Sequence, residues 1–482
     1  MFKKHTKIIC TLGPACDSVE MITKMVHAGM NIARLNFSHG SYDSHKNIIN
    51  NIRTVERETG RPIAIMQDLQ GPKIRVGNLP AEGIALEDGK TYLYDTRVKE
   101  YKNNIIPIDY EDMHKLLKKG DRFLMDDGKI EGVVEKVVGT RISIKIIMGG
   151  VLGGHKGINI PDSDENVRAM TDKDREDARF GVANDVDFIA LSFVTNAADI
   201  LDLRFLIEEY EKKLKIKKDK RQPIGIVAKI ERDDAVDNIE EIIDVADGIM
   251  VARGDLGVEM PAADVPLIQK HVIDLCLSAG KPVIVATQML DSMQKSMRPT
   301  RAEVSDVANA VIDHTDAVML SNETATGKFP LQAVKTMAEI VSETEKSVYN
   351  DLTVEEPSIK KSRPVDDVMC QLSRELAERV HAKVILTASI TGDTARLIGR
   401  YRPELPILVG VMNERVRRQL CMSWGIIPFM LEPCNSIEEL VSRSLVYLKD
   451  EKFVDKGDSI IVVAGEPVGH AGHVNLLEVR KI

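Results

Sequence analysis

Two apolar segments near the middle of the chain each end abruptly in charged residues. Lys229 and Glu231 follow the segment IGIVA, and Arg253 and Asp255 follow the segment GIMV. An amphipathic stretch of helical length separates them, which predicts a strand, helix, strand unit whose parallel strands bring both charged ends to one edge of a sheet. One ammonium and two carboxylates would then converge. Such a group suits a divalent metal held by hard oxygen ligands, beside a cation that meets phosphate charge.

The same residues have a simpler interpretation, in which the two carboxylates are loop residues that pair only with Lys229 and Arg253. The surrounding elements help to decide. Short apolar runs alternate with helical segments along the chain, which is expected of parallel βα units. Eight such runs are present: residues 7–12, 32–37, 63–66, 188–193, 224–228, 248–251, 283–286 and 317–320. Eight units predict a closed (β/α)8 TIM barrel, whose chemistry lies at the carboxyl ends of its strands.

Polar side chains gather at the ends of these apolar runs. They are Arg34, Asn36, Ser38, Asp68, Ser192, Lys229, Glu231, Arg253, Asp255, Thr287, Gln288, Ser321 and Glu323. A chance arrangement would scatter polar groups along the runs. The pattern therefore favours an active site over isolated surface ion pairs.

The chain is predicted to contain three domains. Residues 1–71 and 164–345 form the barrel, or A domain. Residues 72–163 change to short alternating strands with Gly-rich turns, which predicts an inserted small β-barrel domain, the B domain, placed to act as a lid. Residues 346–482 restart with a helix and several strands, which predicts a C-terminal open α/β domain, the C domain.

The first predicted strand of the C domain runs into TASITGDTAR, where Ser and Thr side chains and a glycine open a helix. Free N–H groups at a helix N-terminus bind phosphate well. An ordinary N-capped helix is the alternative, since Thr and Asp are favoured caps. The sequence alone leaves both interpretations open.

Composition excludes several classes of protein. The 482 residues carry 65 basic and 74 acidic side chains, a net charge of -9, which does not favour a nucleic-acid or membrane-surface binder. No stretch reaches the roughly 20 apolar residues of a membrane helix. The six cysteines form no zinc or disulfide pattern, so we expect reduced thiols and a cytoplasmic protein.

Several long motifs resemble those of the pyruvate kinase family: KIICTLGPA, NIARLNFSHG, AKIE followed by MVARGDLGVE, ATQML, and RPTRAEVSDVANAVIDHTDAVMLSNETATGKFP. The resemblance covers nearly the whole chain. It implies a (β/α)8 A domain, a lid-like B domain, an α/β C domain and a homotetramer. The implied reaction is phosphoryl transfer from phosphoenolpyruvate to ADP, giving pyruvate and ATP.

The resemblance also implies roles for individual residues. Glu231 and Asp255 resemble the ligands of the divalent metal, Mg²⁺ or Mn²⁺. Lys229 resembles the residue that stabilises the phosphoryl group in flight, and Arg34 a second phosphate contact. Thr287 resembles the threonine near the carbon at which the enolate is protonated, whether by this residue or through water. These roles suit phosphoryl transfer, which depends mainly on positioning and positive charge.

Other positions are similar to substrate and nucleotide contacts of the family. The backbone at Arg253 and Gly254, next to the second metal ligand, is expected to hold the substrate carboxylate. Arg75, His39 and Lys156 resemble nucleotide-side contacts, with Lys156 brought in by lid closure.

One departure from the family concerns a monovalent cation. Many members have TKGPE after the third-strand aspartate and require K⁺, held near that glutamate and by the counterparts of Asn36, Ser38 and Asp68. Here the segment is LQGPK, with Leu69 and Lys73. A lysine ammonium supplies the same unit charge, so we predict that K⁺ is not required. The alternative is that Lys73 points to solvent and K⁺ still binds.

A second departure lies in the C domain. Compared with members activated by fructose 1,6-bisphosphate, Ser389 and Ile390 lengthen the loop and Asp393 adds negative charge, which costs phosphate affinity. An allosteric phosphate site is still expected, with AMP or a monophosphorylated sugar at least as plausible as the bisphosphate. Its predicted residues are Thr387, Ser389, Thr391, Gly392 and Thr394.

Two other functions are compatible with part of the sequence pattern. A barrel lyase that acts through a magnesium enolate also uses a Glu and an Asp as metal ligands, but it does not explain the lid, the C domain or the phosphate-directed Lys229 and Arg34. A non-catalytic metabolite sensor on the same fold predicts damage at the catalytic positions. Lys229, Glu231, Asp255 and Thr287 are all intact.

Overall fold

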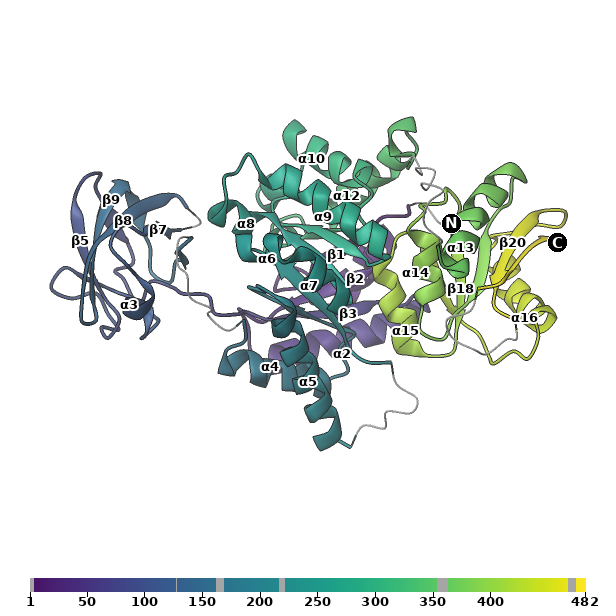
Figure 1. Cartoon of the computed structure of the whole chain (residues 1–482), viewed down its shortest axis with the longest axis horizontal. Coiled ribbons are helices and arrows are strands. Elements are labelled where there is room, and N and C mark those ends of the chain that lie inside the picture. Colours follow the sequence, from purple (N-terminus) through teal and green to yellow (C-terminus); the bar gives the residue numbers. More distant parts are fainter. Residues whose placement is uncertain (1–3, 127, 162–168, 216–221, 353–362, 467–473) are drawn as a thin grey trace.

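The computed structural model describes residues 4–126, 128–161, 169–215, 222–352, 363–466 and 474–482. Figure 1 shows three bodies in a row, with the inserted domain at one end, the barrel in the middle and the C-terminal domain at the other end. The predicted boundary between residues 163 and 164 lies outside the described residues. Within the described ranges, no helix has the length and apolarity needed to cross a membrane.

The barrel is closed and all eight predicted strands are confirmed. They are β1 (Lys7–Thr11), β2 (Ile32–Asn36), β3 (Ala64–Asp68), β12 (Phe188–Leu191), β13 (Gly225–Ile230), β14 (Gly248–Ala252), β15 (Val283–Ala286) and β16 (Ala317–Leu320). The order around the barrel is β1-β16-β15-β14-β13-β12-β3-β2, with parallel pairing throughout. Apolar side chains such as Ile9, Met66 and Met250 fill its interior, so the interior is a packed core and not a pore.

Helices surround the barrel and pack their apolar side chains against it. They are α1 (Val19–Ala28), α2 (Tyr42–Thr59), α4 (Asp172–Ala183), α5 (Ala197–Lys213), α6 (Asp233–Asp237), α7 (Ile239–Val245), α8 (Arg253–Glu259), α9 (Val265–Ala279), α10 (Arg301–Ile312), α11 (Asn322–Ala325) and α12 (Pro330–Glu345). Ser41, Thr171 and Thr300 form capping boxes at the starts of α2, α4 and α10. Gly60 and Gly280 end α2 and α9 with φ of 70° and 66°, a conformation that glycine adopts without steric cost.

The inserted domain is a small β structure with its own core. Its strands are β4 (Ile84–Leu86), β5 (Thr91–Asp95), β6 (Ile105–Pro107), β7 (Arg122–Met125), β8 (Ile130–Val138), β9 (Arg141–Met148), β10 (Gly150–Leu152) and β11 (Ile158–Asn159), with one short helix, α3 (Met113–Leu116). The sheets run β11-β7-β8-β9-β5-β6 and β10-β4. Tyr94 and Phe123 are fully buried in the hydrophobic core of the domain. This independent core allows the domain to act as a rigid lid.

The C-terminal domain is an open α/β sheet, as predicted. Its elements are α13 (Val365–Arg379), β17 (Ile385–Ala388), α14 (Asp393–Gly399), β18 (Ile407–Val411), α15 (Glu414–Gln419), β19 (Ile426–Met430), α16 (Ile437–Asp450), β20 (Ser459–Ala464) and β21 (Leu476–Lys481). The sheet order is β19-β18-β17-β20-β21. Only β21 is antiparallel, and the sequence analysis missed it. Buried ion pairs join the domain to the barrel, from Arg402 to Asp316 at 2.9 Å and from Arg418 to Asp187 at 2.6 Å.

Candidate active site

Lys229 lies at the centre of a charged cluster at the carboxyl ends of the barrel strands. Its Nζ is 2.7 Å from Glu231 Oε1 and 3.3 Å from Asp68 Oδ1. It also donates a hydrogen bond of 2.8 Å to Ser192 Oγ, whose own hydroxyl donates to the Leu69 carbonyl. The ammonium of β13 is therefore fixed by the last residue of β3 and by side chains that directly follow β12 and β13.

The electrostatics keep this ammonium charged. Burial alone would lower the pKa of Lys229, but Asp68 and Glu231 raise it above its usual value. Burial also raises the pKa of Glu231, and the nearby Lys229 opposes that rise. The pKa of Asp68 is lowered because Arg34 and Lys229 outweigh the opposing effect of burial. A cation held in this way favours negative charge that develops next to it.

Arg34 joins the same cluster from β2. Its Nε donates to Asp68 Oδ2 at 2.6 Å, and its Nη1 donates to Thr11 Oγ1 at 2.9 Å. Asp68 thus carries Arg34 on one oxygen and Lys229 on the other. The structure brings together the two cations that the sequence predicted as phosphate contacts.

Glu231 and Asp255 provide hard oxygen donors beside this cation. Glu231 is almost completely buried, and its Oε2 accepts the Phe193 N–H at 2.8 Å. Asp255 is more open, with 28% of its side chain exposed. Within the described ranges, no group of three or more His, Cys, Asp or Glu side chains forms a metal site. Two carboxylates at an open mouth suit a Mg²⁺ ion that takes its other ligands from substrate and water.

Lys73 forms an ion pair with Asp255 in this charged cluster. Its Nζ is 3.3 Å from Asp255 Oδ1, so its ion pair is with the second predicted metal ligand. The residues of the predicted monovalent-cation region have other contacts. Asn36 Oδ1 accepts the Ser38 N–H, and Leu69 is buried.

Thr287 lies in a strained turn directly after β15. Its φ is +70° and that of Gln288 is +55°, and a β-branched residue in this region is a genuine outlier. The Thr287 hydroxyl accepts the Gly254 N–H at 2.7 Å and donates to the Ala286 carbonyl at 2.6 Å. Such strain concentrates at functional sites. The sequence carried no signal of this strain, because a glycine is the residue expected where φ is positive.

The side chain of Arg253 points to α10 and the Thr287 turn. The guanidinium forms a bidentate pair with Asp306 at 2.6 and 2.7 Å, and its Nη2 also donates to the Thr287 carbonyl at 2.9 Å. This side chain therefore braces the strained turn against α10 and is not available for the predicted carboxylate contact, which the sequence assigned to the backbone. The sequence analysis missed Asp306, whose importance follows only from its position across the turn.

The predicted nucleotide contacts divide into two places. The pKa of His39 is lowered by burial and then by the cations Arg75, Arg34 and Lys73, which places His39 in a positive region. Arg75 Nη1 donates to the His155 carbonyl at 3.0 Å. Lys156 instead lies in the lid, where its Nζ is 2.8 Å from Asp126 Oδ1.

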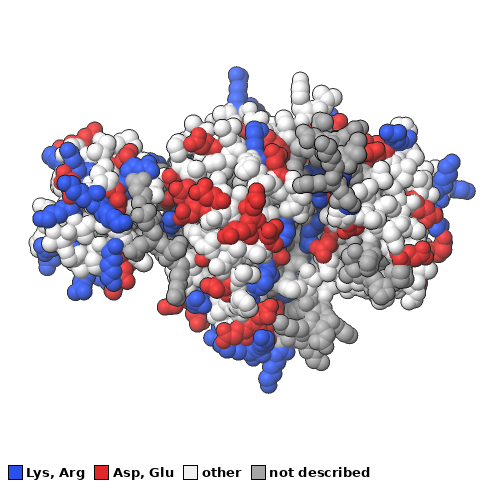
Figure 2. Space-filling model, viewed as in Figure 1, with Lys and Arg blue, Asp and Glu red and all other residues white. Residues whose placement is uncertain are grey.

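The lid also contacts the barrel rim through Asn159, which donates to Glu259 of α8 at 2.9 Å. Figure 2 shows many Lys and Arg side chains on the lid and a group of acidic side chains on the neighbouring barrel face.

The predicted effector loop forms a compact turn before α14. Gly392 has φ of +92°, and its N–H donates to Ser389 Oγ at 2.9 Å. Thr391 Oγ1 donates to Asp393 at 2.7 Å, and Asp393 pairs with Arg396 at 2.9 Å. Arg396 thus supplies the compensating cation that an aspartate beside a phosphate site requires. Thr387 is fully buried, and Thr394 lies in the first turn of the helix.

Comparisons with known proteins agree with this geometry. The family model described as pyruvate kinase, barrel domain, matches residues 3–334, and that described as pyruvate kinase, alpha/beta domain, matches residues 367–480. The pyruvate kinase of Geobacillus stearothermophilus is 41% identical over 100% of this chain and 81% of its own length. That of Clostridium acetobutylicum is 40% identical over 99% of this chain and 100% of its own length. The crystal structure of a Cryptosporidium parvum pyruvate kinase has 36% identity and a TM-score of 0.89, covering 99% of this chain and 96% of that one. With the barrel and its cluster of Lys229, Glu231 and Asp255, these matches show that the chain belongs to the pyruvate kinase family.

Proposed function

We propose that this pyruvate kinase transfers a phosphoryl group from phosphoenolpyruvate to ADP through the cluster around Lys229. The observation that carries the proposal is the buried ammonium of Lys229, held 2.7 Å from Glu231 and 3.3 Å from Asp68 at the carboxyl ends of the strands. This ammonium and the Arg34 guanidinium offset the charge of the moving phosphoryl group. Catalysis of this reaction rests mainly on such positioning and electrostatic stabilisation.

Glu231 and Asp255 would hold Mg²⁺ or Mn²⁺. The bound ion supplies positive charge that orients and neutralises the phosphate and carboxylate of the substrate. The backbone at Gly254 is adjacent to these ligands and supports the substrate carboxylate. The Thr287 hydroxyl is fixed by Gly254 and Ala286, and we assign it to the protonation of the methylene carbon of the enolate, either directly or through water.

The nucleotide is assigned to the space between the barrel mouth and the lid. His39 contributes from the barrel, Arg75 contributes from the base of the inserted domain, where it contacts His155, and Lys156 contributes when the lid closes. Lys156 is paired with Asp126, so it must release this carboxylate to bind a phosphate oxygen. The lysine therefore has an anionic partner both before and after the exchange.

We further propose that Lys73 makes K⁺ unnecessary. Its ammonium beside Asp255 already supplies a monovalent positive charge within the cluster. The proposal is that this ammonium stands in for the monovalent cation expected near Asn36, Ser38 and Asp68.

Regulation and assembly are assigned to the C domain and the exposed helices. The turn of residues 387–394 and the compensating Arg396 support a phosphorylated effector such as AMP or a sugar monophosphate. Large apolar side chains are exposed on α9 and near α10, including Leu267 at 67% and Met297 at 59%, which supports a homotetramer. The six free cysteines suit a cytoplasmic enzyme.

Neither rival function has support from the comparisons, because the relatives that span the whole chain are named pyruvate kinase. The decisive test is the initial rate of pyruvate formation from phosphoenolpyruvate and ADP with Mg²⁺, first without K⁺ or NH₄⁺ and then with K⁺ added. High activity that K⁺ barely changes is expected. Activity only with K⁺ would keep the reaction and reject the role of Lys73. No activity in either buffer, even with AMP and sugar phosphates, would reject the reaction.

A further inference from the structure

A small pocket lies where the barrel meets the C-terminal domain. Asp316 directly precedes β16 in the pocket wall, and Lys281 follows the end of α9. The pocket is therefore at the amino ends of the barrel strands, opposite the active-site mouth. Arg396 and Arg400 line it from α14 and its C-terminal end. The pocket encloses about 240 Å³, part of it open to solvent.

The basic side chains of the pocket exceed the acidic ones that neutralise them. Arg400 is 3.1 Å from Asp367, but this one carboxylate also pairs with Arg363 at 2.6 Å. Lys281 donates to the backbone carbonyls of Ala246 at 2.6 Å and Asp244 at 3.4 Å. In the part of the chain that the structure describes, Lys281 forms no ion pair with a carboxylate. The pocket consequently carries excess positive charge.

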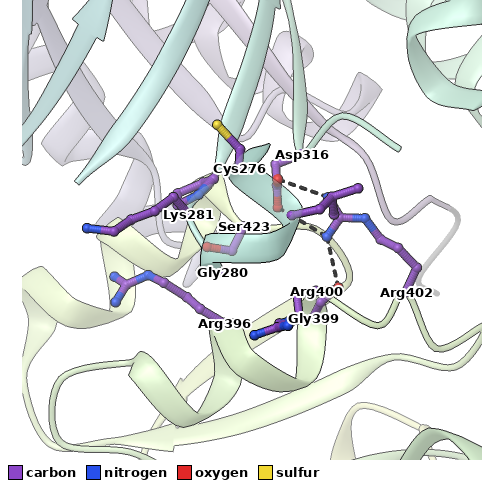
Figure 3. A pocket seen from close by; sticks show the side chains of 11 residues that line it. Cys276, Gly280, Lys281, Asp316, Arg396, Gly399, Arg400, Arg402 and Ser423 are labelled. Atoms are coloured by element: carbon purple, nitrogen blue, oxygen red, sulfur yellow. Dashed lines mark hydrogen bonds and ion pairs between the residues drawn. The ribbon is translucent and has the colours of Figure 1, made fainter. Parts of the chain in front are cut away.

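Two buried polar groups in the pocket wall also have no partner among the described residues. Arg402 and Ser423 are only 4% and 3% exposed, yet Arg402 Nε and Ser423 Oγ make no hydrogen bond. The other nitrogens of Arg402 bind Asp316 at 2.9 Å and the carbonyls of His314 and Gly399. Figure 3 shows Arg402 beside Asp316, with Ser423 between them and Lys281. Buried polar groups in native proteins are nearly always hydrogen-bonded, so these two require an explanation.

We propose that this pocket is a binding site for a small oxyanion of the phosphate type, either inorganic phosphate or the phosphoryl group of a small ester. Lys281 and Arg400 supply the charge, and the hydroxyl of Ser423 is free to donate a hydrogen bond. The hollow of about 240 Å³ includes open solvent, so the space enclosed by protein is far smaller than the roughly 300–1,000 Å³ of pockets that hold drug-sized ligands. The occupant is therefore much smaller than a nucleotide or a sugar bisphosphate.

Such an anion would join two domains. Lys281 belongs to the barrel, just before β15, whereas Arg400 belongs to the C-terminal domain. An anion between them adds a bridge next to the ion pair of Arg402 and Asp316. The same β15 ends at the strained Thr287 turn, so the site lies on the element that positions an active-site residue. The pocket borders the proposed effector loop through Arg396, which pairs with Asp393, but the proposal rests on Lys281, Arg400 and Ser423.

Trp424 offers a local probe of the site. It is the only tryptophan in the chain, it follows Ser423, and the Arg402 guanidinium lies 5.2 Å from its ring. The experiment titrates the full-length protein with inorganic phosphate at constant ionic strength and follows Trp424 fluorescence, with calorimetry as a second measure of binding. Methyl phosphate is titrated in parallel. Tighter binding of the ester identifies esters as the source of the ligand, and equal or weaker binding identifies the free ion.

We expect a saturable response that Lys281→Gln and Arg400→Gln weaken by about ten-fold or more. Ser423→Ala should also weaken it, and this change removes only an unpartnered hydroxyl, so the fold should be retained. The matched control is Lys335→Gln, an exposed lysine of α12, which should leave the affinity unchanged. Lys229→Met should also leave the Trp424 response unchanged, because that residue belongs to the active site.

Three results would overturn the proposal. The first is no saturable binding, and the second is a response that sodium chloride reproduces at equal ionic strength. The third is an affinity that remains the same in the Lys281, Arg400 and Ser423 variants. None of these results bears on the pyruvate kinase reaction, which is assayed separately.

Discussion

At the scale of single residues, the active site is a network in which each carboxylate fixes a cation. Asp68 holds Arg34 and Lys229, while Glu231 holds Lys229 and accepts the Phe193 N–H. Removing one partner would leave another buried charge without compensation, which is costly. The side chain of Lys229 therefore has a structural as well as a chemical role.

Replacing Lys229 with methionine separates phosphoryl transfer from enolate chemistry. The change removes the cation next to the phosphoryl group but leaves Thr287 and its hydrogen bonds in place. We expect Lys229→Met to lower kcat for pyruvate formation by at least about 10³-fold, consistent with the loss of a key transition-state charge. Metal-dependent exchange of the pyruvate methyl protons, followed by NMR in D₂O, should remain measurable. Equal loss of both activities would contradict the assigned role.

At the scale of elements, two lysines have environments set by the fold. Lys156 lies in the lid, and Lys4 lies in the segment that enters β1. The lid has its own core and contacts the barrel rim through Asn159 and Glu259. Lys156 and Lys129 both approach Asp126 in the lid, at 2.8 and 3.5 Å. They form a matched pair for testing the nucleotide assignment.

Lys156→Met is expected to raise the KM for ADP by about ten-fold, because a charged hydrogen bond to phosphate contributes roughly 1.5–3 kcal/mol. Lys129→Met serves as the control. Lys129 also pairs with Asp126, and its side chain is 68% exposed. Steady-state kinetics with varied ADP measure the effect. Equal changes in the two variants would show that general lid charge, and not Lys156, is responsible.

The segment that enters β1 makes stability depend on pH through Lys4. Burial and the nearby Lys7 lower the pKa of Lys4 to about 7, whereas its usual value is 10.5. Above pH 7 the folded protein has released this proton while the unfolded chain still binds it. Linkage then requires that the free energy of unfolding rise with pH between these two values.

Lys4→Gln should remove this part of the pH dependence. Between pH 7 and pH 9, the free energy of unfolding of the wild type should rise by up to about 2 kcal/mol more than that of the variant, at 1.36 kcal/mol per pKa unit. Urea unfolding at both pH values measures the difference, and the exposed Lys335→Gln should behave as the wild type. A Lys4 variant with the wild-type pH dependence would disprove the assignment.

At the scale of the whole molecule, Figure 1 shows the lid and the C-terminal domain at opposite ends of the barrel. The two ends of the barrel strands therefore serve different purposes. The carboxyl ends carry the catalytic cluster, and the amino ends carry the ion pairs with the C-terminal domain. The proposed effector signal would therefore have to cross the length of the barrel to reach the charged cluster.

The proposed homotetramer predicts a light-scattering mass close to four chains of 53.5 kDa each. Leu267→Asp in α9 should lower that mass, because a buried charge at a subunit interface is unfavourable. Phe205→Asp is the control, since Phe205 is 70% exposed on α5, which lies on the other side of the barrel from α10 in Figure 1. A tetramer broken by the Phe205 change alone would place the interface elsewhere.

The sequence by itself determined the barrel, the inserted domain and the residues at the strand ends. Apolar runs of regular spacing leave few alternatives for parallel βα units, and parallel strands necessarily bring their carboxyl ends together. Lys229, Glu231 and Asp255 could therefore be grouped without coordinates. Strand β21 was missed because its burial is only partial, so it lacks the apolar pattern of the other strands.

Only the tertiary structure decided which charges pair and where the backbone is strained. Lys73 meets Asp255, and Arg253 meets Asp306 across 53 positions of sequence. The positive φ of Thr287 and the unpartnered groups beside Asp316 likewise depend on contacts between distant elements. Sequence patterns report which face of an element is buried, whereas ion pairs and strain depend on distances of a few ångströms that packing alone fixes.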